Sequence, residues 1–220
     1  MIDAIIKFKQ ELITALLETF NMLLVAMIFT LVIGLILGII LYLTKKDGIY
    51  QNKIIYTIIS TAINILKSIP FILFIIVIIP FNRFLIGTGF GVYASMIPLS
   101  LVGIATFARL AEQSFLDLNK DIYETSYALG SSKIDFVRYF MIKESRSSLV
   151  LNYTQSVISI LSYSTVMGVI GGGGLGYLAI SEGYHNFNYS LMWVIIIIMI
   201  IMVQLIQLLG SIIAKKIDKK

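Results

Sequence analysis

Residues 19–43 read TFNMLLVAMIFTLVIGLILGIILYL and contain no charged side chain. A helix needs about 20 consecutive apolar residues to cross the hydrocarbon core of a bilayer, so this stretch by itself predicts a membrane span. Lys45, Lys46 and Asp47 follow it closely and end it. The fold is therefore expected to be organised by helices that cross a membrane.

The composition of the whole chain supports this class of protein. Of 220 residues, 58% are hydrophobic and only 13% are charged, and the mean hydropathy is +0.94. Soluble domains are nearer half apolar and a quarter charged. Further apolar runs cover residues 54–79 (with Pro70 inside), 90–111, 149–170 and 190–213. We expect an all-α integral membrane protein with five transmembrane helices, forming a single domain over residues 1–220.

The N-terminal residues 2–18 carry apolar side chains at roughly helical spacing. Lys7, Lys9, Glu11 and Glu18 lie between them. This pattern is typical of an amphipathic helix lying on the bilayer surface, and a helical extension of the first span fits it equally well. The charges before the apolar run, and the length of that run, argue against a cleavable signal peptide.

The distribution of basic residues predicts the orientation. Five spans put the two termini on opposite sides of the membrane. One set of segments holds Lys45, Lys46, Lys53, Lys120, Lys133, Arg138, Lys143, Arg146, Lys215, Lys216, Lys219 and Lys220. The opposite set holds Lys7, Lys9 and Arg83. By the positive-inside rule, the N-terminus is outside, while the C-terminus and the segment 112–148 are cytoplasmic. This arrangement disfavours a nucleic-acid partner for the net charge of +5.

Several kinds of chemistry are excluded or disfavoured by residue usage. The chain has no cysteine and one histidine, His185, so it has no disulfide, and we expect no metal site. No carboxylate pair lies deep in a span, which argues against a membrane-embedded enzyme. The spacing Gly171-x-Gly173-x-x-Gly176 follows a membrane span rather than a strand, so we interpret it as a turn and not a dinucleotide site. No phosphate-binding loop sequence G-x-x-x-x-G-K-[ST] occurs, so any ATP must bind to another subunit.

The polar segment 112–148 is expected to form two short helices. Asp121 and Glu124 have the spacing of a capping box, which predicts a helix start at Asp121. Gly130 suits the end of that helix, and Ser132 suits the start of the next. Both helices are too poor in apolar residues to span a membrane, so they must bury their apolar faces against the bundle or a partner.

Within this segment, Glu124-Thr-Ser-x-x-x-Gly130 resembles the "EAA" loop of ABC importer permeases. In that family the loop is a short coupling helix that docks on a cytoplasmic ATPase. The resemblance implies these coupling residues: Glu124, Ala128, Leu129, Gly130, Ser131 and Ser132. Two positions depart from the family pattern, because Thr125 stands where alanine is usual and Lys143 stands where a proline is usual.

Further motifs make nearly the whole chain similar to the methionine importer permeases, which belong to the binding-protein-dependent transport permeases. They are found at residues 64–72, 79–83, 86–88, 163–164, 172–176 and 183–184. The resemblance implies a homodimer in the bacterial inner membrane that imports methionine (L- or D-, or both) by alternating access. Its implied partners are two ATP-binding subunits, which hold ATP and Mg, and an extracytoplasmic methionine-binding lipoprotein. One alternative is an importer permease for another amino acid or small organic solute. A second alternative, from a different class of protein, is a membrane-embedded enzyme or a structural scaffold.

Four residues are candidates for the substrate pathway. The resemblance places Ser164, Val166 and Met167 there. Lys67 lies in the middle of a predicted span, where a buried ammonium costs at least ~2.5–3.5 kcal/mol. It is expected either to face a pore or subunit interface, or to pair with a backbone carbonyl freed by Pro70. Arg109 and Glu112 are interpreted as snorkelling interface residues, and His185 as a polar surface residue or a contact for a docking protein.

Overall fold

One unbroken helical run, Lys9–Thr44, is the longest element of the computed structural model, which describes residues 2–119 and 121–218. Its parts are α2 (Lys9–Phe29), a π-helical turn (Thr30–Gly34) and α3 (Leu35–Thr44). At 1.5 Å per residue the run is about 54 Å long, well beyond the ~30 Å of a hydrocarbon core. The first predicted span is confirmed, and residues 9–18 form its extension.

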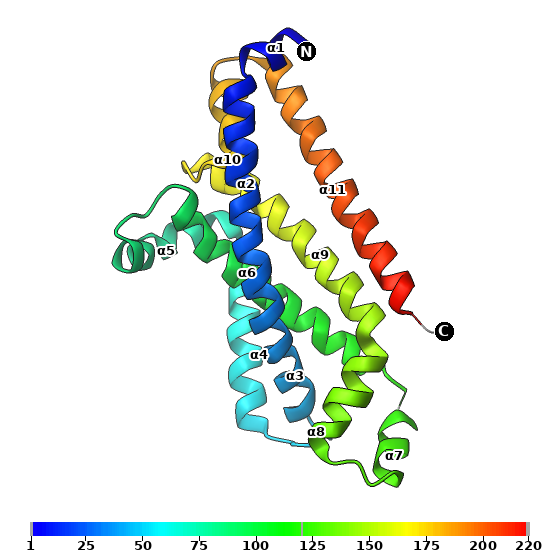
Figure 1. Ribbon diagram of the computed structural model, residues 1–220. Helices are drawn as coiled ribbons and strands as arrows, with labels where there is room; N and C mark the ends of the chain where they lie inside the picture. Colours follow the sequence, from blue (N-terminus) through cyan, green and yellow to red (C-terminus); the bar gives the residue numbers. More distant parts are fainter. Residues whose placement is uncertain (1, 120, 219–220) are drawn as a thin grey trace.

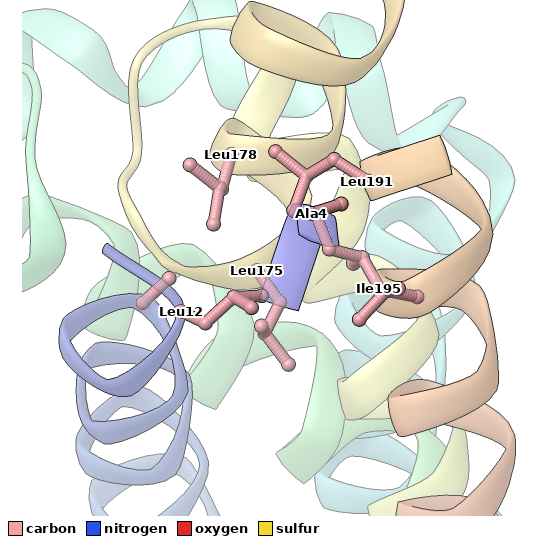
Figure 2. Packing of buried hydrophobic residues seen from close by; sticks show 8 residues of the cluster. Ala4, Leu12, Leu175, Leu178, Leu191 and Ile195 are labelled. Carbon is pink, nitrogen blue, oxygen red and sulfur yellow. The ribbon is translucent and has the colours of Figure 1, made fainter. Parts of the chain in front are cut away.

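The short helix α1 (Ile2–Lys7) precedes this run and is separated from it at Phe8. Figure 2 shows Ala4 of α1 among apolar side chains from three other helices. The labelled members of this cluster are Ala4, Leu12, Leu175, Leu178, Leu191 and Ile195. Packing of apolar side chains therefore ties the N-terminus to the last part of the chain.

The second predicted span, residues 54–79, is broken at the Pro70 that lies inside it. Its residues form α4 (Lys53–Ser68) and α5 (Phe71–Ile86), whose axes are bent by 112°. Pro70 has no N–H to continue the helix, and it restricts the preceding residue to extended backbone. Ile69 accordingly has φ −78° and ψ 125°. In Figure 1, α5 projects sideways from the body of the molecule.

The third predicted span is confirmed as α6 (Val92–Leu116), which lies at the centre of the molecule. It is the most buried of the long apolar helices among the described residues. A Cβ added to Gly38 on α3 would lie 2.7 Å from the Ala111 Cβ and 2.9 Å from the Ala108 carbonyl oxygen on α6. Small residues thus allow α3 and α6 to approach closely. Inside a bilayer the hydrophobic effect contributes little to the association of helices, so close packing of this kind stabilises the pair.

The polar segment forms two short helical elements and leads directly into the fourth predicted span. The elements are α7 (Asp121–Ala128), α8 (Lys133–Asp135), a π-helical turn (Phe136–Met141) and α9 (Ile142–Val169). From Lys133 to Val169 the helix is continuous. Lys143, which stands in place of the family's proline, lies in the first turn of α9 and keeps its backbone N–H available to the helix.

A glycine turn follows α9 and leads to the last helices, α10 (Gly174–Leu178), a π-helical turn (Ala179–His185) and α11 (Tyr189–Ile217). Gly171 and Gly173 have φ of +78° and +80°, a region that residues with a Cβ rarely adopt. The predicted turn at the end of the fourth span is confirmed, and the chain bends there by 43°.

The described residues contain no β-strand. Three of their helices are long and apolar enough to cross a membrane, or up to five if each bent pair counts as one span. Figure 1 shows α1 and the start of α11 at one end of the molecule, with α7, α8 and the start of α4 at the other. The basic residues Lys120, Lys219 and Lys220 lie outside the described residues.

Candidate functional site

The end of α7 is closed by backbone hydrogen bonds at Gly130. The Ser131 N–H donates to the Ser126 carbonyl at 3.1 Å, and the Gly130 N–H donates to the Tyr127 carbonyl at 3.0 Å. These two bonds form a Schellman motif, which needs a residue with positive φ, and Gly130 has φ +71°. The predicted helix stop at Gly130 is confirmed. It produces a sharp elbow between α7 and α8.

The start of the next helix is fixed by a reciprocal pair of side chains. The Asp135 N–H donates to Ser132 Oγ at 3.2 Å, and the Ser132 N–H donates to Asp135 Oδ2 at 3.3 Å. This capping box confirms the predicted helix start at Ser132. The predicted helix start at Asp121 is also confirmed, because α7 begins there, and the Asp121 N–H donates to Asn119 Oδ1 at 3.2 Å.

The elbow, residues 121–135, exposes large apolar side chains at an otherwise polar end of the molecule. Tyr127 is 76% exposed, Leu129 is 70% exposed and Ile134 is 74% exposed. Of the residues expected to couple to an ATPase, Ser131 is half-buried, and the exposed ones are Glu124, Ala128, Leu129, Gly130 and Ser132. The sequence interpretation did not single out Tyr127 and Ile134. Grouped apolar side chains of this kind mark an interaction surface.

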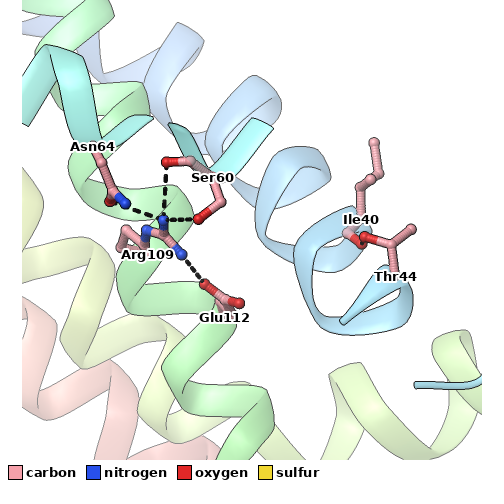
Figure 3. Close-up of polar contacts among 6 residues, drawn as sticks. All are labelled: Ile40, Thr44, Ser60, Asn64, Arg109 and Glu112. Atoms are coloured by element: carbon pink, nitrogen blue, oxygen red, sulfur yellow. Dashed lines mark hydrogen bonds and ion pairs between the residues drawn. The ribbon is translucent and has the colours of Figure 1, made fainter. Parts of the chain in front are cut away.

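A charged cluster joins α6 to α4 (Figure 3). Arg109 Nη1 donates to Glu112 Oε2 at 2.7 Å, and Arg109 Nη2 donates to the Ser60 carbonyl at 3.0 Å. Nη2 also donates to the Ser60 hydroxyl and, at 2.8 Å, to Asn64 Oδ1. The interpretation of Arg109 and Glu112 as snorkelling interface residues is therefore wrong. Glu112 is only 5% exposed, and a buried carboxylate requires such a partner.

The cluster borders a cleft of about 620 Å³ between α4 and the second half of α6. The lining residues are Asn64, Lys67, Ser68, Arg109, Glu112, Gln113, Leu116 and Asp117. Lys67 is exposed and has no hydrogen bond or ion pair within residues 2–119 and 121–218. Its expected pairing with a backbone carbonyl near Pro70 is not found among those residues. Lys67 lines the cleft instead.

The other three pathway candidates lie on α9. Ser164 and Met167 are 3% and 2% exposed and pack inside the protein, while Val166 is half-buried. The Ser164 hydroxyl donates to the Leu161 carbonyl at 2.7 Å, and Met167 belongs to an apolar cluster with Met22. The structure does not bring these residues to the cleft of Lys67. Their role in a pathway stays a prediction.

No group of three or more histidine, cysteine or carboxylate side chains suited to a metal ion occurs in the described part of the chain. His185 is exposed and its ring lies 5.5 Å from that of Tyr184, in the turn before α11. The two features with the strongest indication of function are therefore the elbow and the charged cleft.

Comparisons with known proteins identify the family of this chain. Residues 31–220 match the model of the binding-protein-dependent transport system inner membrane component, and the chain belongs to this family. It is 35% identical over 204 residues to the probable D-methionine transport system permease protein MetI of Pasteurella multocida, covering 93% of this chain and 94% of that one. It is 36% identical over 182 residues to the methionine import system permease protein MetP of Bacillus subtilis, covering 82% of each.

Solved structures support the same conclusion. An inward-facing structure of the MetNI methionine ABC transporter contains a chain that matches with a TM-score of 0.93 and 32% identity. The match covers 97% of this chain and 99% of that one. An amino acid ABC transporter solved with histidines matches with a TM-score of 0.79 and 18% identity, over 96% of each chain, and shows the shared fold. The expected class, an all-α permease of the inner membrane, is confirmed.

Proposed function

We propose that this chain is the membrane-spanning permease subunit of an ATP-driven importer that carries methionine into the bacterial cell. The observation that supports this most directly is the match to the methionine transporter over 97% of the chain. The relatives named for methionine import match along most of their own length as well. The chain itself performs no covalent chemistry in this proposal. It provides the path through the bilayer.

The elbow is the coupling element in this proposal. Each of two permease copies offers its elbow to one ATP-binding subunit, and that partner holds ATP and Mg. The support is the exposure of Tyr127, Leu129 and Ile134 at an end of the molecule that also carries Glu124 and Gly130. Because α8 continues without a break into α9, a push on the elbow would reach the membrane helices directly.

In the orientation that we propose, the elbow lies in the cytoplasm and the N-terminus lies outside. Lys45, Lys133 and Arg138 belong to connections at the end of the molecule that carries the elbow. Basic residues concentrate in cytoplasmic connections of membrane proteins. Residues 112–148 then form a cytoplasmic segment within a single permease domain.

Transport would proceed by alternating access in a homodimer, supplied by an extracytoplasmic methionine-binding lipoprotein at the end that carries α1 and His185. The path would run between α9 and α11 of the two copies. Since Ser164 and Met167 are buried inside the protomer, they contact substrate only if α9 separates from α2 during the cycle. Val166, which is half-buried, needs a smaller movement.

The test is uptake of labelled methionine by cells or vesicles that contain the permease with its own ATP-binding and substrate-binding subunits. We expect ATP-dependent accumulation that unlabelled L- or D-methionine suppresses and that other amino acids in equal excess leave unchanged. Uptake of another amino acid in preference to both methionine enantiomers would overturn the proposed substrate.

A further inference from the structure

The helix α4 carries a polar face through a predominantly apolar molecule. Polar side chains recur every three or four residues along it, at Thr57, Ser60, Thr61, Asn64, Lys67 and Ser68. This spacing puts them on one side of a helix. Polar and charged groups in membrane helices face a partner or a water-filled cavity. Three members of this face, Asn64, Lys67 and Ser68, line the charged cleft.

The charges around this cleft fall into two kinds. Arg109 is engaged, because its two terminal nitrogens donate to Glu112 and to groups of Ser60 and Asn64 on α4. Its function is to hold α4 against α6. Lys67 and Asp117 are different, because both are exposed and neither side chain has a hydrogen bond or ion pair among the described residues.

Lys67 and Asp117 have opposite charges and approach the cleft from opposite sides, one from α4 and the other from the end of α6. Lys67 is in the last turn of α4, and Asp117 directly follows α6, which also contributes the apolar side chain of Leu116 to the cleft. A volume of about 620 Å³ is in the range of small-molecule sites. An α-amino acid carries a carboxylate and an ammonium on one carbon, and an apolar side chain beside them suits methionine.

We propose that this cleft is a binding site for a zwitterionic α-amino acid at the elbow side of the path, with Lys67 binding the carboxylate and Asp117 the ammonium. The identity of the amino acid as methionine rests on the proposed function. Arg109 acts as a positioning residue that fixes the distance between the two helices. Leu116 contacts the thioether side chain.

The absence of cysteine from the sequence allows a direct binding measurement. A single thiol introduced by Gln113→Cys lies in the cleft, where Gln113 is exposed. The full complex with its ATP-binding subunits, in lipid nanodiscs, is treated with a neutral thiol reagent, and the modified permease is quantified by its mass. The probes are methionine, methioninol (which lacks the carboxylate) and 4-(methylthio)butanoate (which lacks the amine).

We expect methionine to slow the modification of this thiol and both analogues to protect it more weakly. In the Gln113→Cys background, Lys67→Met should raise the half-protecting methionine concentration about tenfold or more, because a charge-assisted hydrogen bond is lost. Lys67→Arg should restore protection, and Asp117→Asn should weaken it. Lys53→Met is the matched control, since Lys53 begins the same helix outside the cleft. Equal protection in Lys67→Met and Lys53→Met would overturn the inference.

Methionine uptake by the unsubstituted complex separates this inference from the proposed function. If the complex imports methionine but methionine does not protect the thiol, the inference about the cleft is wrong and the proposed function stands. If the complex does not import methionine, the proposed function fails. Protection of the thiol by a different amino acid would then locate that substrate at the same two charges.

Discussion

The Glu18 carboxylate on α2 accepts a hydrogen bond of 2.7 Å from the Gly174 N–H, 156 residues away at the first turn of α10. Beside it, Thr19 Oγ1 accepts one of 2.8 Å from the Leu175 N–H. The first turn of a helix has unpaired N–H groups and a partial positive charge, so a carboxylate there is stabilising. The hydrogen bonds of Glu18 and Thr19 thus connect the first turn of α10, directly after the glycine turn, to α2.

Replacement of Glu18 tests how much its hydrogen bond to the Gly174 N–H stabilises the fold. Glu18→Ala should lower the free energy of unfolding by about 1 kcal/mol, as the loss of a helix cap does, and lower Tm by about 2–4 °C. Glu18→Gln should cost less, because the amide oxygen can still accept. Thermal unfolding of the purified permease measures this. Glu11→Ala, at an exposed position on the same helix, is the control, and an equal Tm for both alanine variants would contradict the assignment.

Gly130→Ala should impair coupling more than folding. Gly130 and Gly87 have φ of +71° and +80°, and an added Cβ meets open space at both. The backbone strain of alanine is therefore similar, about 1 kcal/mol. If the elbow transmits motion, Gly130→Ala should reduce methionine uptake several-fold while Gly87→Ala leaves it near the unsubstituted level. A similar loss in both variants would mean that strain alone, and not the elbow, explains the effect.

Arg109→Met should destabilise the protein severely, because it leaves the Glu112 carboxylate buried without a partner. Removing one member of a buried pair costs about 3–5 kcal/mol. The double variant Arg109→Met with Glu112→Gln removes the uncompensated charge and should recover part of this loss. Thermal unfolding of the unsubstituted protein, the two single variants and the double variant gives the coupling free energy between the two residues. Strictly additive effects would show that their ion pair is not what holds α6 to α4.

Features determined by neighbouring residues were predictable from the sequence. The helix stop at Gly130 depends on backbone conformation within a few residues, and the capping box of Ser132 and Asp135 depends on side chains three apart. The start of α7 at Asp121 agrees with the local sequence pattern as well. Apolar length likewise identified the first and third spans.

Features that depend on tertiary packing were not predictable. Pro80 and Pro98 lie inside α5 and α6, yet at Pro70 the chain bends by 112°. A proline thus permits a break, and the packing around it decides whether one occurs. The contacts of Arg109 involve residues 45 and 49 positions away, which no local pattern reveals. Two signals for the cleft were present in the sequence, the charge of Lys67 within an apolar run and the helical spacing of polar residues on α4.

Retention of the ATP-binding subunit on a tagged permease tests the central claim most directly. We expect Leu129→Glu to reduce retention at least about tenfold, because a carboxylate would be buried in an apolar contact. Phe187→Glu is the matched control, since Phe187 is 73% exposed in the turn before α11, away from the elbow. The predicted result is loss of the ATP-binding subunit from Leu129→Glu and its full retention on the control Phe187→Glu. Full retention in Leu129→Glu, and also in Tyr127→Glu and Ile134→Glu, would contradict docking at the elbow.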